Sequence, residues 1–159
     1  MLKKPLLLLP LACASVAAAQ TKCAVPVLKL LRNGQEIPAT GSAPAPTVTL
    51  QVAAEPGCPS PAIYRFRQAQ ATLVRQGRPV LPALLITQPQ ADLTPLLRAA
   101  RPGDQVYVFI PYGSLVTVAA DGKQQPYQPP QAAPSRTRPL DLQTDHAKGI
   151  NFVWKLVRE

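Results

Sequence analysis

Short segments in which apolar and polar residues alternate run along most of the chain, and turn residues separate them. Residues 48–54, for example, place Val48, Leu50 and Val52 on one face of an extended strand. Alternation with a period of two is typical of a β-strand with one buried face, and a helical period is nearly absent here. The pattern therefore predicts an all-β chain.

Three glycine-containing pairs mark turns between the predicted strands. Asn33-Gly34 and Asp121-Gly122 have the composition of tight hairpin turns, because both residue types tolerate a positive φ. Gln76-Gly77 turns the chain from residues 62–75 into residues 79–86. These pairs predict antiparallel strands that are neighbours in sequence.

The longest extended region, residues 62–86, changes phase within its first half. Tyr64 and Phe66 share one face, with Arg65 on the other. Farther along, the inward set is Ala69, Ala71 and Leu73, which is displaced by one residue. A shift of one residue predicts a β-bulge near residues 67–68.

The chain ends in a strand with a heavy apolar face, formed by Ile150, Phe152, Trp154 and Leu156. One short helix is expected within residues 90–104, with Thr94 as its cap, Pro95 in its first position and Pro102 after its end. About eight hairpin-linked strands with one short helix predict an Ig-like antiparallel β-sandwich.

The N-terminus has the organisation of a secretory signal peptide. Lys3 and Lys4 precede a short apolar run, and small residues at 17–19 supply a cleavage site. We therefore expect residues 1–19 to be removed and residues 20–159 to form a single exported domain. The alternative is an uncleaved anchor, although the apolar run is short for a membrane span.

Three cysteines bear on where the protein resides. Cleavage after Ala19 removes Cys13 and leaves Cys23 and Cys58, and an even number in an exported chain predicts one disulfide. The alternative is a lipoprotein, because Cys13 follows a partial lipobox, Pro-Leu-Ala. The two readings differ in whether the protein is tethered to a membrane in the periplasm or released.

Charge narrows the choice of partner only slightly. The chain has 17 basic and 8 acidic side chains and a formal net charge of +9. The basic residues are spread out rather than interleaved with aromatics, so no nucleic-acid motif is visible. Arg65, Arg67 and Arg75 are expected on one strand face, which is either a solvated surface or a contact for anionic glycan or lipid.

Several segments resemble a known family when taken in order: "RFRQAQATLVRQGRP", "LLRAARPGDQVYVFI", "ADGKQQPY" and "INFVWKLV". Together they are similar to the C-terminal β-domain of GldM, the periplasmic shaft protein of the gliding-motility and type IX secretion motor of Bacteroidetes. The matching positions are Phe66, Gly103-Asp104, Asp121-Gly122 and Phe152 to Leu156. The resemblance covers residues 62–157 and implies a stand-alone envelope domain with an Ig-type fold. Ala120 departs from it, since the family has Pro there.

Residues 128–139 are rich in Pro, Gln and Ala and are expected to form a flexible loop.

Few residues of the chain have the arrangement that a catalytic site requires. His146 is the single histidine, and it lies in a polar loop beside Asp145. The acids fall mostly at turns, and no serine has a Gly-x-Ser-x-Gly context. We therefore expect a non-enzymatic protein with no cofactor and no metal.

Three features are candidates for binding. Tyr107 and Phe109 face outward if the valines beside them face the core, and Tyr112 follows closely. An exposed aromatic strip marks a partner site, but the alternative is that both faces of this strand are covered. The second feature is the basic face at Arg65 and Arg67, and the third is a free edge strand that accepts a strand of another chain.

The sequence therefore predicts an exported, non-enzymatic cell-envelope module that binds another protein or assembles in the envelope. The alternative function is a carbohydrate-binding or polysaccharide-processing accessory domain, which requires aromatic side chains on an exposed face.

Overall fold

The computed structural model describes residues 26–58, 62–119, 121–129 and 148–157. Nearly all regular structure is β. The strands are β1 (Val27–Arg32), β2 (Gln35–Glu36), β3 (Thr47–Ala53), β4 (Ile63–Phe66), β5 (Ala69–Arg75), β6 (Arg78–Pro79), β7 (Leu84–Ile86), β8 (Gln90–Asp92), β9 (Gln105–Pro111), β10 (Leu115–Val118), β11 (Gln124–Pro126) and β12 (Gly149–Lys155). The helical elements are α1 (Thr94–Leu97) and the 3-10 turn η1 (Tyr112–Ser114).

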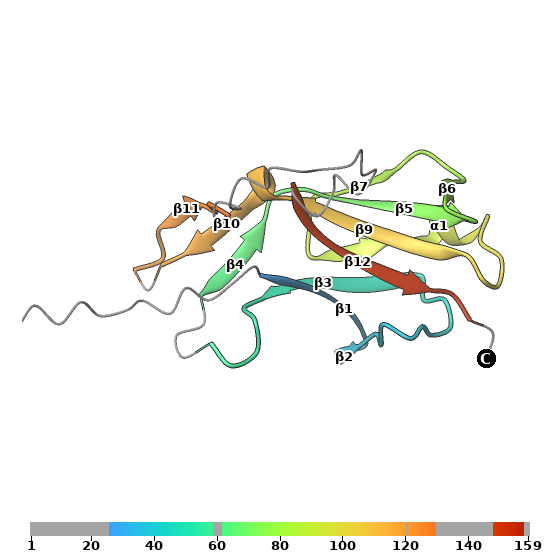
Figure 1. Ribbon diagram of the computed structural model, residues 1–159, viewed down its shortest axis with the longest axis horizontal. Coiled ribbons are helices and arrows are strands. Elements are labelled where there is room, and N and C mark those ends of the chain that lie inside the picture. The colour runs from blue at the N-terminus through green and yellow to red at the C-terminus, as the bar shows by residue number, and fades with distance from the viewer. Residues whose placement is uncertain (1–25, 59–61, 120, 130–147, 158–159) are drawn as a thin grey trace, which may run out of the picture.

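The strands form a β-sandwich, as the alternating pattern predicts. One layer has the order β2-β1-β3-β8, and the other has the order β12-β9-β5-β6 with β7 also paired to β5. A third sheet, β11-β10-β4, projects from one end of the sandwich (Figure 1). All pairings between named strands are antiparallel.

The predicted hairpin turns are confirmed. Asn33 has φ 51° and Gly34 has φ 81°, and Gln76 and Gly77 have φ 49° and 76°. Positive φ at both central residues is the geometry of a type I′ turn, whose twist suits the flanking strands. The third hairpin, between β10 and β11, forms at the predicted place, but only Gly122 of the Asp121-Gly122 pair has a positive φ, at 80°, and its N–H donates to the Ala119 carbonyl at 2.8 Å, so this turn is longer than two residues.

The change of phase in the long strand is where the chain passes from one sheet to another. β4 pairs with β10, whereas β5, beginning only three residues after the end of β4, pairs with β9. The Arg67 N–H still donates to the Ser114 carbonyl, at 2.8 Å, across the bend. The expected bulge is therefore a break of two residues that divides the strand between the sheets.

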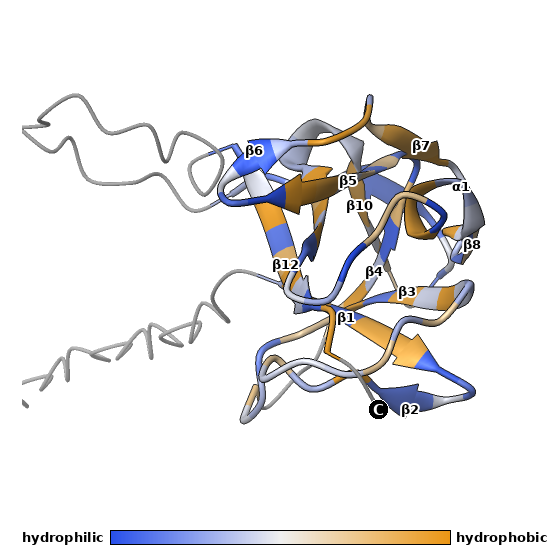
Figure 2. Cartoon of the chain, turned by 90° about the vertical axis from the view of Figure 1, so that its right-hand side faces the viewer, coloured by the Kyte–Doolittle hydropathy of each residue, from blue (hydrophilic) through white to orange (hydrophobic). Residues whose placement is uncertain are grey.

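The core lies between the two layers and collects the inward positions of every long strand. Its largest fully buried side chain is Trp154, and its fully buried aliphatic members are Leu30, Val48, Leu73, Leu93, Val106, Val108, Ile110 and Leu115. Seen from one end, the short edge strands β2 and β6 are hydrophilic (Figure 2). Polar edge strands of two residues each limit unwanted strand pairing.

The segment before β3 fixes the end of β12 by close contact. The Trp154 Nε1–H donates to Ser42 Oγ at 3.0 Å, and the Ser42 N–H donates to the Lys155 carbonyl at 3.1 Å. Gly41 has φ 112°, and a Cβ added there would lie 2.7 Å from the Lys155 oxygen. Glycine is therefore required at this crossing.

The helix is a single turn, and the expectation that Thr94 caps it is wrong. Thr94 is its first residue, and the carboxylate of Asp92 instead accepts the Thr94 N–H at 2.9 Å. The hydrogen bonds with Thr94 lower the pKa of Asp92. Pro95 does lie in the first turn, where a missing N–H has no consequence.

Several predictions fall outside the described residues: the signal peptide at 1–19, Cys13, Cys23, His146 and the part of the expected loop from residue 130 to 139. Cys58 is disulfide-bonded. Its pairing with Cys23 stays a prediction. Within the part of the chain that the structure describes, no helix is long and apolar enough to cross a membrane.

Candidate functional site

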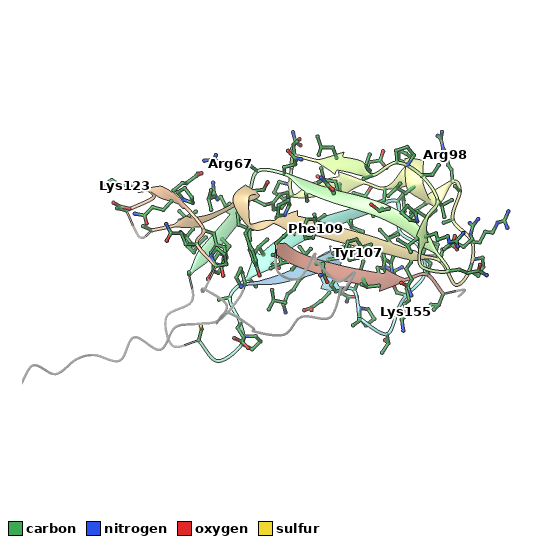
Figure 3. The ribbon with its side chains drawn as sticks, turned by 45° about the horizontal axis from the view of Figure 1, so that its top comes forward. Arg67, Arg98, Tyr107, Phe109, Lys123 and Lys155 are labelled. Carbon is green, nitrogen blue, oxygen red and sulfur yellow. The ribbon has the colours of Figure 1, made fainter. Side chains whose placement is uncertain are left out.

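The strongest candidate site is an aromatic pair on the outer face of β9. Val106, Val108 and Ile110 point into the core and are fully buried. Tyr107 and Phe109 therefore lie on the opposite face, where both are half-buried. Their ring centroids are 6.4 Å apart and their planes differ by only 10°. Figure 3 shows the two residues near the middle of the sheet.

The neighbours of this pair follow from the strand register. Tyr107 lies opposite Thr72 on β5 and Val153 on β12, and Phe109 lies opposite Gln70 and Asn151. Because residues directly opposite each other share a face of the sheet, these side chains surround the rings. We call the set the aromatic face: Gln70, Thr72, Tyr107, Phe109, Asn151 and Val153.

A glycine beside the aromatic face fixes the position of one ring. A Cβ added to Gly149 would lie 2.6 Å from Cε2 of Phe109, so the Phe109 ring lies directly over this glycine. An aromatic ring that covers a glycine on a neighbouring strand shields the backbone there and loses rotational freedom itself. The Phe109 ring therefore packs against the backbone of β12 at Gly149.

The aromatic face carries no charged side chain among its six residues. Its Val153 is 37% exposed, and Leu85 on β7, which pairs with Gln70, is 56% exposed. Lys155, which pairs with Gln105 one step beyond Tyr107, is the nearest cation along β12 (Figure 3). An uncharged aromatic centre with charge at the rim is the usual composition of a protein-binding surface.

Tyr112 does not join the aromatic face, contrary to the expectation of one continuous strip. η1 turns the chain away, and Tyr112 packs with Tyr127 at 5.5 Å between ring centroids. Tyr64 meets Tyr127 edge-on at 5.9 Å. Burial, with smaller contributions from the two neighbouring tyrosines, raises the pKa of Tyr127 to about 12. Burial also raises the pKa of Tyr112. These rings join the small sheet to the sandwich.

The predicted basic face is divided by the break in the long strand. Arg65 is exposed on β4 of the three-stranded sheet, and Arg67 is exposed in the break that follows it, both apart from Tyr107 and Phe109. Arg75 has the inward phase of β5 and binds Asp104 instead. The expectation that the three arginines share one face is therefore wrong for Arg75.

Arg75 and Asp104 form an ion pair at the other end of β5, in which the carboxylate is buried and the guanidinium is partly exposed. Asp104 is 3% exposed and is the one charged residue counted as buried in the described chain. Its carboxylate accepts two guanidinium N–H bonds, at 2.9 and 2.8 Å, and the Arg101 backbone N–H at 2.8 Å. The bonds with Arg75 lower the pKa of Asp104 despite its burial. This carboxylate orders the turn before β9 by accepting the Arg101 N–H.

No arrangement for catalysis or metal binding stands out among the described residues. No group of three His, Cys, Asp or Glu side chains lies close enough together there to hold a metal ion. Asp121 stabilises its own hairpin by accepting the Lys123 N–H at 3.0 Å. The described acidic residues with shifted pKa values therefore accept hydrogen bonds that stabilise turns, and Asp104 also binds Arg75.

Sequence reasoning found the two rings but missed their surroundings. The site also includes Gln70, Thr72 and Asn151, because β5 and β12 pair with β9 on either side. These pairings bring together segments that lie far apart in the sequence. The local feature that indicated the site was the spacing of Tyr107 and Phe109, two residues apart in one strand.

No protein family, curated protein or solved structure matches the chain. The likeness to the GldM domain thus stays a prediction.

Proposed function

We propose that this protein is an exported, non-enzymatic module of the cell envelope that binds another protein through the aromatic face. The observation that carries the proposal is the nearly parallel Tyr107–Phe109 pair at the centre of an uncharged patch of the sheet. Tyrosine and phenylalanine are enriched in the centres of protein interfaces, where they supply large contact areas.

The rigidity of this face favours binding. Both rings stand on a central strand that is paired on each side, and Phe109 is held over Gly149. Ordered side chains lose little conformational entropy when a partner binds, so more of the contact energy becomes affinity.

Export is supported by two independent features of the chain. The N-terminal pattern of lysines, an apolar run and small residues is that of a secretory signal. The disulfide at Cys58 suits an oxidising compartment outside the cytoplasm. The likeness to the GldM domain points in the same direction, toward the envelope of a bacterium that uses domains of this type.

A carbohydrate-binding role is the second candidate, and one observation favours it. The two ring planes are nearly parallel, and the amides of Gln70 and Asn151 lie on either side of Phe109. Sugar rings stack on aromatic faces while their hydroxyls accept and donate hydrogen bonds to amides. The aromatic face therefore suits either a protein or a carbohydrate, and a binding experiment distinguishes the two.

Two matched variants test the proposal. Val153→Asp places a charge in the aromatic face, and Val27→Asp places one on the outer face of the opposite sheet, where the valine is 38% exposed against 37% for Val153. We expect Val153→Asp alone to abolish co-purification of a defined envelope protein that crosslinks to the wild type. Loss of retention on immobilised envelope polysaccharide, with protein capture unchanged, would support the carbohydrate role. Equal behaviour of both variants in both assays would refute the site.

A further inference from the structure

A groove separates β3 from β4 at the end of the sandwich where the three-stranded sheet begins (Figure 1). Its volume is about 630 Å³, and residues of β3, of β4 and Pro89 line it. The aromatic face lies on a different sheet and contributes no residue to this groove. What distinguishes the groove is the state of the two strand edges beside it.

The edge of β4 that faces the groove is open. The Arg67 N–H donates to Ser114, and β4 runs antiparallel to β10 in that register. Because backbone groups alternate in direction along a strand, Arg65 and Ile63 also point toward β10. The N–H and C=O groups of Tyr64 and Phe66 therefore point the other way, where no described strand pairs with β4.

The facing edge of β3 is open as well, and a proline is the cause. The Leu50 N–H donates to the Pro89 carbonyl at 2.7 Å, at the end of the β3–β8 ladder. Pro89 has no N–H to return to the Leu50 carbonyl, so the ladder stops there. By the same alternation, Val52 directs its N–H and C=O toward the groove, beyond the last β8 partner in the described chain.

We propose that this groove is a second binding site, which takes up an extended segment of a partner protein as an added β-strand. Open N–H and C=O groups along a strand edge are what an incoming strand recognises, and side chains beside the edge select its sequence. The site requires no catalytic chemistry, and it stands whether or not the aromatic face binds a protein.

The side chains of the groove define the partner segment. Ile63 is 62% exposed, which is the largest exposure among the large apolar residues of the described chain. Arg65 is the one charged side chain among the residues that line the groove. The partner segment therefore has apolar residues at alternate positions and an acidic residue that reaches Arg65, which also suits the net charge of +9.

A second copy of the chain fits this edge poorly. β4 has four residues, so pairing β4 with β4 of another copy would bring the two Arg65 side chains close together. Like charges on neighbouring strands destabilise the pairing. The charge of Arg65 thus favours a different, acidic segment over self-association.

The test is selection from a displayed library of random peptides about nine residues long, enough to extend a strand. The target is the whole exported chain, and bound peptides are then measured against two variants. Ile63→Asp introduces a negative charge into the groove. Leu85→Asp is the matched control, since Leu85 is 56% exposed but lies beside the aromatic face. Neither side chain belongs to the core.

We expect enriched peptides with alternating apolar residues and at least one Asp or Glu. Ile63→Asp should weaken their binding by about tenfold or more, whereas Leu85→Asp should leave it unchanged. In NMR amide exchange, a bound peptide should protect the N–H of Tyr64 and Phe66 or of Val52. The proposal is overturned if no peptide is enriched, or if bound peptides are insensitive to Ile63→Asp. Peptides that respond only to Leu85→Asp would also overturn it, while supporting the aromatic face.

Discussion

Arg75 and Asp104 join the end of β5 to the start of β9 through two parallel hydrogen bonds, from Nε to Oδ1 at 2.9 Å and from Nη2 to Oδ2 at 2.8 Å. The same guanidinium donates to the Ala99 carbonyl at 3.0 Å, so it also holds the end of the helical turn. Both carboxylate oxygens of Asp104 thereby accept hydrogen bonds. Bidentate pairs of this kind fix geometry as well as charge.

We expect Asp104→Asn to lower the free energy of unfolding by about 1–3 kcal/mol at pH 7, because one charge-assisted contact is lost in a buried setting. The bonds with Arg75 hold the pKa of Asp104 below its ordinary value of 3.8 in the folded state. A lowered folded pKa contributes stability above the unfolded pKa, and this contribution is lost as the pH falls through the folded pKa. Urea unfolding at pH 7 and at pH 3 should therefore show a smaller acid-induced loss in Asp104→Asn than in the wild type.

The control for this prediction is Asp121→Asn, at an exposed turn with a lowered pKa of its own. It lacks the contact with Arg75, so it should leave stability at pH 7 nearly unchanged. An equal acid sensitivity in wild type and Asp104→Asn would contradict the assignment of this dependence to the Arg75 pair.

Trp154 provides the test of the core. It is fully buried, and its indole N–H reaches Ser42. Trp154→Ala should cost about 3–5 kcal/mol of unfolding free energy, because a large cavity remains at the centre of the sandwich. Ser42→Ala removes only the hydrogen-bond acceptor and should cost about 1 kcal/mol. Chemical denaturation followed by circular dichroism measures both, and a loss under about 1 kcal/mol for Trp154→Ala would contradict its central position.

Local features were predictable from the sequence. The turns at Asn33-Gly34 and Gln76-Gly77 depend only on two neighbouring residues each. The inward faces of β3, β9 and β12 follow from the alternation of apolar and polar residues. Pairings between distant segments were not. That β12 lies beside β9, and that β4 leaves the sheet that holds β5, depends on packing over the whole chain. Arg75 was misplaced for a different reason, because beyond the shift at residues 67–68 it shares the inward phase of Ala69, Ala71 and Leu73, which the sequence already showed.

The two type I′ hairpins allow a reciprocal exchange. Gln76 has φ 49° and Asn33 has φ 51°, so both stand in the left-handed region, which Asn tolerates better than Gln. Gln76→Asn should raise the free energy of unfolding, and Asn33→Gln should lower it, each by about 1 kcal/mol or less. Thermal melts of the two variants and of the double exchange measure this. Changes of the same sign in both single variants would argue against backbone strain as the cause.

Gly149→Ala tests whether the ring of Phe109 is held by the glycine beneath it. The added methyl would overlap the carbonyl oxygen of Ile110 as well as the ring, with 2.6 Å between the new carbon and Cε2 of Phe109, so both the backbone of β9 and the ring must shift. We expect a loss of about 1–3 kcal/mol in unfolding free energy from overpacking and weaker binding at the aromatic face. Phe109→Leu removes the ring while keeping an apolar side chain, so in that background Gly149→Ala should cost less, and the cost that remains comes from the overlap with the Ile110 carbonyl oxygen. A double-mutant cycle by urea unfolding gives the coupling, and strict additivity would show that the two residues do not interact.

The disulfide prediction concerns both stability and location. A bond between Cys23 and Cys58 closes a loop of about 35 residues and should stabilise the fold by roughly 3–4 kcal/mol through the unfolded chain. Cys58→Ser should lower the unfolding free energy by that amount under oxidising conditions and leave it unchanged relative to the wild type under reducing ones. Intact mass of the protein from its host envelope, with and without reductant, identifies the bond and the N-terminus together. A chain that starts at Gln20 and gains two hydrogens on reduction carries the Cys23–Cys58 bond, whereas an acylated chain starting at Cys13 is a lipoprotein, and the search for partners then moves to the surface of that membrane.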